Sequence, residues 1–278
     1  MQISIIGLGL IGGSMAIDLK KRGFAKKVIG VDTSKLHLNT SLNMGIIDQA
    51  CTLDDAIDNS DLIIFAIPAN ETIRLLPKVL DRVSHQMVTD ACSVKGTICE
   101  RVKFHPKRQN FVASHPMAGT ENSGPWAAQS GMFDGKAVIF CDAEDSSEEA
   151  LSTIKKMYEY LNMRPLYMNA YNHDVHVAYV SHISHISSFA LALTVLDKEK
   201  NEKNIFNLAS GGFDSTVRLA KSSADMWTTI FENNSENVIS VLDTYIDKLN
   251  DFKTAINESN SDKMNELIQK ANRIKKIL

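Results

Sequence analysis

Residues 3–14 read ISIIGLGLIGGS, and this stretch decides the fold. A run of β-forming residues leads directly into a Gly-x-Gly-x-x-Gly pattern made by Gly7, Gly9 and Gly12, and helical sequence follows. In a dinucleotide-binding fold the first glycine permits a tight turn, the second lets a pyrophosphate approach the backbone, and the third allows close packing of helix on strand. The phosphates lie at the helix N-terminus. The pattern therefore predicts a Rossmann-type α/β domain.

A carboxylate follows where such domains bind the ribose of the nucleotide. Asp32 lies 20 residues beyond Gly12, at the expected end of the second strand, where it can accept hydrogen bonds from the ribose hydroxyls. An acid there repels a 2′-phosphate, no Arg is adjacent, and Lys35 is the only nearby cation. NAD is therefore favoured over NADP as the cofactor. The residues expected to contact it are Gly7, Gly9, Leu10, Ile11, Gly12, Asp32, Pro68 and Ser93.

Short β-rich runs alternate with helical stretches through the first part of the chain. The expected strands are residues 3–6, 28–31, 62–67, 87–89, 111–113, 137–140 and 165–168. This alternation predicts a parallel sheet with helices on both faces. Beyond it the β signals stop, and amphipathic helices follow, most clearly at 178–196 and 233–256. We expect two domains, an NAD-binding domain over residues 1–168 and a helical domain over 169–278.

Composition excludes some classes of protein. Hydrophobic residues make up 44% of the chain and charged residues 23%, with a net charge of −3, which is typical of a globular protein and leaves no basic footprint for nucleic acid. We find no window of 18 or more apolar residues that suggests a membrane span. Without a basic n-region or cleavage site at the N-terminus, we expect a cytoplasmic protein. The four cysteines form no CxxC pair, which indicates reduced thiols.

Polar residues follow three of the expected strands, at 68–71, 90–95 and 114–116. Because the carboxyl ends of parallel strands meet at the ligand crevice, these are the candidate positions for chemistry. His115 in the third segment could accept a proton from a substrate hydroxyl while hydride leaves the adjoining carbon. The alternative is a structural histidine that bonds its own loop.

The second half adds a group of histidines and one arginine. His173, His176, His182 and His185 form two HxxH pairs, and the i, i+3 spacing places each pair on one helical face. A zinc site is one interpretation. Acidic companions are few, no Cys is near, and dehydrogenation by NAD needs no metal, so we expect none. Arg218, after a Gly-Gly pair, is either a fork for a carboxylate or an exposed helix arginine.

Taken together, five stretches carry a resemblance to a known family. They read GLGLIGGS, DACSVK, SHPMAGTENSG, HDVHVAYVSHISH and GGFDSTVRLA…MW, in that order. The chain thereby resembles the prephenate and arogenate dehydrogenases of tyrosine biosynthesis along nearly its whole length. The resemblance implies oxidative decarboxylation of prephenate to 4-hydroxyphenylpyruvate with hydride transfer to NAD. Arogenate, which would give tyrosine directly, is the alternative substrate.

The resemblance also implies roles for individual residues. His115 is then the catalytic histidine that hydrogen-bonds the ring hydroxyl of the substrate, and Ser93 lies between the nicotinamide and that hydroxyl. The remaining substrate contacts would be Arg218 at a carboxylate, His185 and Trp227 at the pyruvyl side, and Thr120 and Glu121 beside the pocket. The helical domain would form a homodimer interface. We expect neither a chorismate mutase module nor a regulatory ACT domain, and hence no feedback control through one.

Two other classes remain as alternatives. The β-hydroxyacid dehydrogenases join a similar nucleotide domain to a helical one, but they use a lysine in the helical half as acid and base. No Gly-rich, Lys-terminated helix of that type is present here, and SHPMAG would be unexplained. A non-enzymatic NAD-sensing module would need no His115, Ser93 or Arg218.

Overall fold

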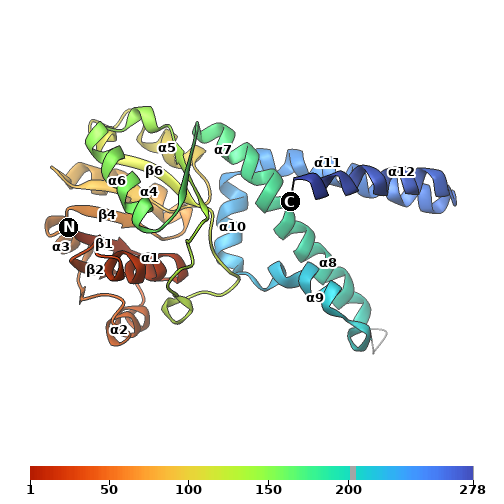
Figure 1. Cartoon of the computed structure of the whole chain (residues 1–278), viewed down its shortest axis with the longest axis horizontal. Helices are drawn as coiled ribbons and strands as arrows, with labels where there is room; N and C mark the ends of the chain where they lie inside the picture. The colour runs from red at the N-terminus through yellow and green to blue at the C-terminus, as the bar shows by residue number, and fades with distance from the viewer. Residues whose placement is uncertain (201–204, 278) are drawn as a thin grey trace. The chain divides into compact units, whose positions relative to one another are not determined.

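The computed structural model describes residues 1–200 and 205–277, which cluster into two compact units, Met1–Asn234 and Ser235–Leu278 (Figure 1). The first unit holds the sheet, the helices that cover it and the helices up to residue 234. These units divide the chain later than the boundary expected at residue 169, because α10 packs against α4 and α7 against α5. The domain boundary at residue 169 stays a prediction.

An eight-stranded sheet forms the centre of the first unit, in the order β3-β2-β1-β4-β5-β6-β7-β8. The strands are β1 (Gln2–Ile6), β2 (Lys27–Val31), β3 (Gln49–Ala50), β4 (Leu62–Phe65), β5 (Met87–Asp90), β6 (Phe111–Pro116), β7 (Ala137–Cys141) and β8 (Arg164–Met168). All but the two-residue β3 were predicted from the sequence. The reversal of strand order beside β1 marks the crevice in which such folds bind nucleotides.

One strand departs from the predicted parallel sheet. β7 pairs antiparallel with β6, whereas the other neighbouring pairs are parallel. A parallel connection needs a crossover, usually a helix, but residues 117–136 link β6 to β7 with only the 3₁₀ turn η2 (Pro125–Ala127). Pairing with β7 also extends β6 to Pro116, so His115 lies within the strand and not after it.

Helices cover both faces of the sheet, as the alternation predicted. Apolar residues of α1 (Leu10–Lys21) and α6 (Glu148–Tyr160) form one core with the strands, and those of α3 (Leu53–Asp58), α4 (Ala69–Arg82) and α5 (Gly96–Val102) form the other. Alternation along β6 sends Val112 into the first core and Phe111 and Ala113 into the second. The remaining short elements here are α2 (Lys35–Asn43), η1 (Arg108–Asn110) and η3 (Ala143–Asp145).

A long helix, Ala170–Glu199, follows the last strand. It consists of α7 (Ala170–Val177), a π-helical turn η4 (Ala178–His182) and α8 (Ile183–Glu199). The expected helix at 178–196 covered the second part and missed α7, which begins where the Asn169 side chain accepts the N–H of Asn172. A π turn contains one extra residue, so the side chains that follow it point in directions rotated from those of a continuous α-helix.

This long helix corrects the expectation that no segment could span a membrane. By length and composition it could, since an 18-residue window reaches a mean hydropathy of 1.3. Its polar positions are largely Ser, Thr and His, which lower hydropathy less than charged residues do. The helix also carries His173 and Asp174, which are buried against the sheet domain. Length and composition alone therefore do not make it a membrane segment.

The rest of the first unit consists of short helices. They are η5 (Phe206–Leu208), α9 (Gly211–Val217), η6 (Arg218–Lys221) and α10 (Ala224–Asn233). Residues of α9 and η6 pack against α8. Trp227 and Ile230 of α10 form a small core with Ala69 and Val94. This core joins the helical segment to the start of α4 and to the loop after β5.

The second unit is a helical pair, α11 (Ser235–Asn257) and α12 (Ser261–Ala271), followed by η7 (Asn272–Lys276). The expected helix at 233–256 matches α11 closely.

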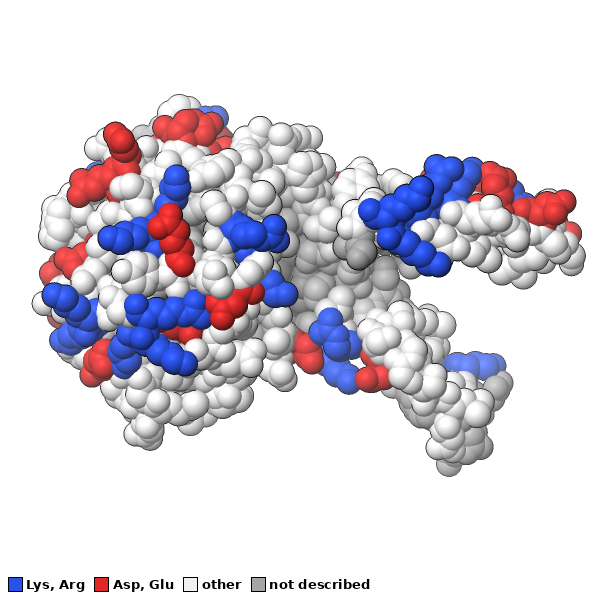
Figure 2. All heavy atoms as spheres, in the orientation of Figure 1, with Lys and Arg blue, Asp and Glu red and all other residues white. Residues whose placement is uncertain are grey.

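In the first unit, the face shown in Figure 2 carries Lys and Arg side chains interspersed with Asp and Glu.

Candidate active site

The loop between β1 and α1 has the geometry that the glycine pattern requires. Gly7 has a φ of 96°, and a Cβ there would lie 2.4 Å from the carbonyl oxygen of Ala66. A Cβ on Gly12 would lie 2.0 Å from the carbonyl oxygen of Gly7. Among the described residues nothing lies within 4 Å of a Cβ on Gly9. The protein's own packing thus requires the first and third glycines, while the second faces open space that suits a pyrophosphate.

The neighbouring groups also fit a dinucleotide. Helix α1 begins after Gly9 without a side-chain cap, so its first N–H groups are available to an anion. Asp32 follows β2, and its carboxylate accepts the N–H of Leu8 at 2.9 Å and that of Ser34 at 2.8 Å. These bonds fix the carboxylate beside the glycine loop. Leu10 and Ile11 lie in the first turn of α1, and Pro68 lies exposed immediately before α4.

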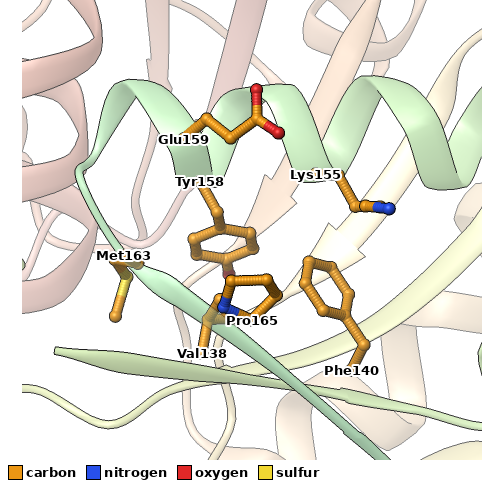
Figure 3. A pocket seen from close by; sticks show the side chains of 7 residues that line it. All are labelled: Val138, Phe140, Lys155, Tyr158, Glu159, Met163 and Pro165. Carbon is orange, nitrogen blue, oxygen red and sulfur yellow. The ribbon is translucent and has the colours of Figure 1, made fainter.

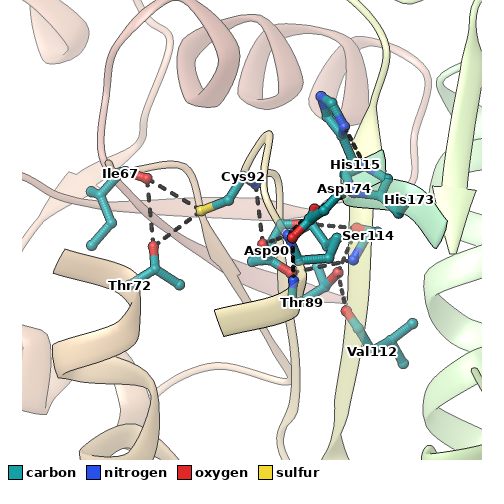
Figure 4. Close-up of polar contacts among 12 residues, drawn as sticks. Ile67, Thr72, Thr89, Asp90, Cys92, Val112, Ser114, His115, His173 and Asp174 are labelled. Atoms are coloured by element: carbon teal, nitrogen blue, oxygen red, sulfur yellow. Dashed lines mark hydrogen bonds and ion pairs between the residues drawn. The ribbon is translucent and has the colours of Figure 1, made fainter. Parts of the chain in front are cut away.

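His115 lies at one end of a chain of buried polar groups that continues through His173 to Asp174 (Figure 4). Its Nδ1 is 2.8 Å from Nε2 of His173 on α7, and Nδ1 of His173 is 2.7 Å from Oδ1 of Asp174. Burial, reinforced by charges on neighbours such as His173 and Lys95, holds the pKa of His115 well below its usual value. Burial also lowers the pKa of His173, although Asp174 opposes this. Both imidazoles are therefore neutral near pH 7.

The loop that carries Ser93 is hydrogen-bonded to Asp174, the last residue of this chain of polar groups. Asp174 accepts the backbone N–H of Lys95 at 2.8 Å and that of Gly96 at 2.7 Å. These two donors begin helix α5, so the carboxylate from α7 holds the loop after β5. Ser93 lies half-buried in that loop.

A buried ion pair supports this loop from beneath. Lys95 and Asp90 are both fully buried, and the Lys95 ammonium donates to the Asp90 carboxylate. The same carboxylate accepts the N–H of Cys92 at 3.1 Å and that of Ser114 at 3.2 Å. Breaking such a pair by removing one partner costs about 3–5 kcal/mol. Lys95 is therefore a structural residue beneath the site.

The helical segment contributes an aromatic cluster. The rings of His185 and Trp227 stack with centroids 3.5 Å apart, and His182 meets Trp227 edge-on. Nδ1 of His185 donates to the carbonyl of Ser181 at 3.1 Å, which leaves Nε2 as an acceptor. Trp227 packs against Val94, next to Ser93. Its buried indole N–H has no hydrogen-bond partner among the described residues.

Arg218 and Glu121 form an ion pair at the edge of the site. Nη1 of Arg218 donates to Oε2 of Glu121 at 2.8 Å, with 51% of the arginine side chain exposed. A backbone hydrogen bond from its own N–H, and then Arg218, lowers the pKa of Glu121. Thr120 is exposed and accepts the N–H of Asn122 at 3.2 Å. Arg218 is thus not an unpaired surface arginine, because Glu121 occupies part of its guanidinium group.

The two HxxH pairs do not act as pairs. His173 is buried against His115, whereas His176 is exposed, so the i, i+3 spacing does not give the two rings the same surroundings. His182 contacts Asn234 at 3.2 Å and His185 stacks on Trp227. The two members of the first pair differ because one face of α7 packs against α5 and β7 while the other is exposed. Within residues 1–200 and 205–277, no group of three His, Cys, Asp or Glu side chains is arranged to hold a metal.

A small cavity lies between α6, β7 and β8, on the face of the sheet that α6 covers (Figure 3). Its lining residues are Val138, Phe140, Lys155, Tyr158, Glu159, Met163 and Pro165. Its volume of about 50 Å³ accommodates a few water molecules at most. The cavity is therefore too small for a six-membered ring with side chains, and we do not assign the substrate to it.

Comparisons with known proteins identify the family of the chain. Residues 15–167 match the family model for the nucleotide-binding domain of prephenate dehydrogenase, and residues 169–270 match that for its dimerization domain. The chain belongs to the prephenate dehydrogenase family. Within this family, the A. aeolicus prephenate dehydrogenase in complex with hydroxyphenyl propionate and NAD⁺ is 29% identical, with a TM-score of 0.88. The alignment covers 100% of this chain and 98% of that one.

Two further relatives in the prephenate dehydrogenase family are named for different substrates, prephenate and arogenate. The prephenate dehydrogenase of Bacillus subtilis (strain 168) is 28% identical over 94% of this chain and 72% of that protein. The Synechocystis arogenate dehydrogenase structure is 26% identical, with a TM-score of 0.76 over 99% of each chain. The family is thus shared by proteins that are named for different substrates.

Two residues of the cluster had no assigned part in the sequence-based site. His173 was considered only as half of an HxxH pair, and Asp174 was not considered. The available signal was a His-Asp dipeptide at the start of the helical segment. Nothing in that dipeptide indicates that it faces a histidine 58 residues earlier in the chain.

Proposed function

We propose that the chain is an NAD-dependent prephenate dehydrogenase that converts prephenate to 4-hydroxyphenylpyruvate in tyrosine biosynthesis. The single observation that carries the proposal is His115, a neutral imidazole held on β6 at the carboxyl end of the sheet. Family membership supports it, as does the A. aeolicus structure, which contains NAD⁺ and hydroxyphenyl propionate. We place the protein in the cytoplasm, like other biosynthetic enzymes of this kind.

The dinucleotide would be held by the residues that fit it. Gly9 provides open space for the pyrophosphate, and the uncapped start of α1 provides N–H donors. Asp32 would accept hydrogen bonds from the adenosine ribose. The other contacts in the proposal are Gly7, Leu10, Ile11, Gly12, Pro68 and Ser93. When bound, NAD accepts the hydride that leaves the substrate.

In the proposed reaction the protein orients the substrate and supplies one proton acceptor. Prephenate carries a hydroxyl and a carboxylate on opposite ring carbons. As hydride leaves the hydroxyl-bearing carbon, His115 takes the hydroxyl proton and a carbonyl forms. The bond to the carboxylate then breaks, its electron pair enters the ring, and carbon dioxide leaves. The phenolate oxygen takes the proton back from His115, so no net proton is released, and aromatisation makes the reaction irreversible.

The remaining site residues would bind the rest of the substrate. Arg218 would hold a carboxylate, and Ser93 would lie near the reacting hydroxyl. The side-chain end of the substrate would meet His185 and Trp227, with Thr120 and Glu121 at the rim. A positioned acid–base group typically contributes about 10²- to 10⁴-fold to the rate.

Arogenate is the alternative substrate, because it differs from prephenate only by an amino group in place of the side-chain keto oxygen. The Glu121 carboxylate beside Arg218 favours this alternative, since it would pair with the ammonium group. Steady-state rates on both substrates, with NAD and with NADP, test the proposal. We expect the highest kcat/KM with prephenate and NAD. A higher kcat/KM with arogenate would establish the alternative, and turnover of neither substrate would refute both.

We also propose that the chain works as a homodimer. The match of residues 169–270 to a dimerization domain supports this. Helices α8 and α11 each expose large apolar side chains, namely Leu193 and Leu196 on α8 and Ile239, Ile246, Leu249 and Ile256 on α11. Such faces are typical of surfaces that a partner covers. Sedimentation at micromolar protein should give the mass of a dimer, and a monomer would refute it.

A further inference from the structure

We infer that Asp174 and His173 are positioning residues that fix His115 in one tautomer, with its proton on Nδ1 and Nε2 left as the base. This inference rests on the proposed function, in which His115 accepts a hydroxyl proton. It adds two residues, and it states which nitrogen of His115 does the chemistry.

Both carboxylate oxygens of Asp174 accept hydrogen bonds from backbone N–H groups. Its Oδ1 accepts the N–H of Lys95 at 2.8 Å and its Oδ2 accepts the N–H of Gly96 at 2.7 Å. A carboxylate whose two oxygens already accept backbone donors acts as an acceptor toward its third neighbour as well. That neighbour is Nδ1 of His173, at 2.7 Å. The proton of His173 must therefore be on Nδ1.

The second link follows from the neutrality of His173. A neutral imidazole with its proton on Nδ1 has a lone pair on Nε2. That Nε2 lies 2.8 Å from Nδ1 of His115, so Nδ1 of His115 must be the donor. A neutral His115 then has its own lone pair on Nε2, which is the only ring nitrogen left for a substrate. Asp174 thus determines a protonation state two side chains away.

Burial makes this arrangement rigid. His173 is fully buried, and 4% of Asp174 and 8% of His115 are exposed. Water has little access to replace either hydrogen bond, and a flipped tautomer would place two donors or two acceptors face to face. When His115 takes up a proton, its Nδ1–H is already donated along a chain that ends in a carboxylate. The same chain thereby stabilises the transient imidazolium, as a carboxylate does behind the histidine of a serine protease.

Asp174 has a second task that makes it more than an orienting acceptor. Its bonds to Lys95 and Gly96 hold the end of the loop that carries Ser93. One carboxylate from α7 therefore aligns the base on β6 and the loop after β5. Moving that carboxylate would disturb both groups that we expect to meet the reacting hydroxyl.

The variants that test this inference change hydrogen bonding and leave size nearly constant. Asp174→Asn removes the negative charge at the end of the chain and places an NH₂ donor against either the N–H of Gly96 or Nδ1 of His173. His173→Leu removes the acceptor for His115, while His173→Gln can still offer an amide oxygen to it. His176→Gln is the matched histidine control, because His176 is exposed on the same helix. Asp142→Asn is the matched carboxylate control, since Asp142 caps the same helix through the N–H of Ala170 at 2.9 Å.

We expect Asp174→Asn and His173→Leu to lower kcat at least about 100-fold, with KM for the substrate changed by about threefold or less. His173→Gln should retain kcat within about tenfold of the wild type, and both controls should match it. Rescue by Gln but not Leu separates an acceptor role from a packing role. Values of kcat within about threefold of the wild type for both Asp174→Asn and His173→Leu would overturn the inference.

A spectroscopic measurement needs neither substrate nor turnover. Long-range ¹H–¹⁵N correlation spectra of the histidine rings distinguish a protonated from an unprotonated ring nitrogen, and His115→Ala identifies the signals of His115. We expect Nδ1 of His115 to carry the proton in the wild type. Protonation at Nε2 would overturn the inference. If the wild type turned over neither prephenate nor arogenate, the proposed function would fail, while this spectrum would still decide the tautomer.

Discussion

The glycine loop and the His115 cluster lie at the same edge of one sheet but are built in opposite ways. The loop is made by backbone within a few residues, and its glycines exclude side chains from the positions at Gly7 and Gly12. The His115 cluster consists of His115 on β6 and of His173 and Asp174 on α7, with the backbone N–H groups of Lys95 and Gly96 bound to Asp174. Its partners lie 58 to 79 residues apart in the chain. The glycine loop is a local site, which tolerates change elsewhere in the chain. The His115 cluster is an assembled site, which depends on the relative positions of several strands and helices. Each can therefore be disrupted without the other.

The largest expected effect is at the assembled site. His115→Ala should lower kcat by about 10²- to 10⁴-fold, because the proton acceptor is lost. The affinity for NAD should stay within about twofold, since the dinucleotide loop lies elsewhere. Stopped-flow or steady-state kinetics and NAD titration measure the two quantities, with His176→Ala as control. Near-normal turnover would remove His115 from the mechanism.

Arg218 tests how far the assembled site extends. Arg218→Ala should raise KM for the substrate by about 10- to 100-fold with a smaller change in kcat, because a carboxylate contact acts in both ground and transition states. We expect no larger effect, since about half of the side chain is exposed to screening by solvent.

The matched control for Arg218 is Lys221→Ala, which removes a cation from the same short helix, where it pairs with Asp214. Arg218→Lys should rescue little, because a point charge does not reproduce a planar fork. An unchanged KM in Arg218→Ala would show that the substrate carboxylate binds elsewhere.

Two alanine substitutions separate the functions of the glycines in the local site. Gly9→Ala should raise KM for NAD by about tenfold or more and leave the melting temperature nearly unchanged, because its methyl group meets ligand and not protein. Gly12→Ala should destabilise the fold by about 1–3 kcal/mol or more, since its Cβ would collide with a backbone oxygen. Thermal melts with and without NAD measure both. Equal loss of stability in the two variants would contradict the distinction.

The smallest expected effect is on pH dependence. An imidazole with a pKa near 6.5 would be about three-quarters protonated at pH 6. Burial holds the pKa of His115 well below that value, and it also lowers the pKa of His173 and brings that of His182 to about 4. Because His115 must be neutral to act, kcat should fall only as the pH drops through its lowered pKa. We expect kcat at pH 6 to be within about twofold of that at pH 8. A fourfold loss by pH 6 would indicate an ordinary histidine.

The sequence predicted much of the architecture because those features depend on near neighbours. Seven of the strands and the helices on both faces followed from β-rich runs that alternate with helical ones. The antiparallel direction of β7 did not, because it depends on the absence of a crossover helix in a long loop. The π turn at Ala178–His182 and the short β3 were also missed, because neither has a periodicity of its own.

By itself, the sequence determined the dinucleotide loop and the acid at Asp32, and it indicated that His115 lies towards the carboxyl end of the sheet. Each of these is a matter of spacing along a few dozen residues. Only the tertiary structure decided what His115 contacts, that Asp174 holds the loop after β5, and that Arg218 is paired with Glu121. The physical reason is distance along the chain: a hydrogen bond between residues 58 to 97 positions apart leaves no periodic trace in the sequence. Which nitrogen of His115 carries the proton is determined by those distant partners.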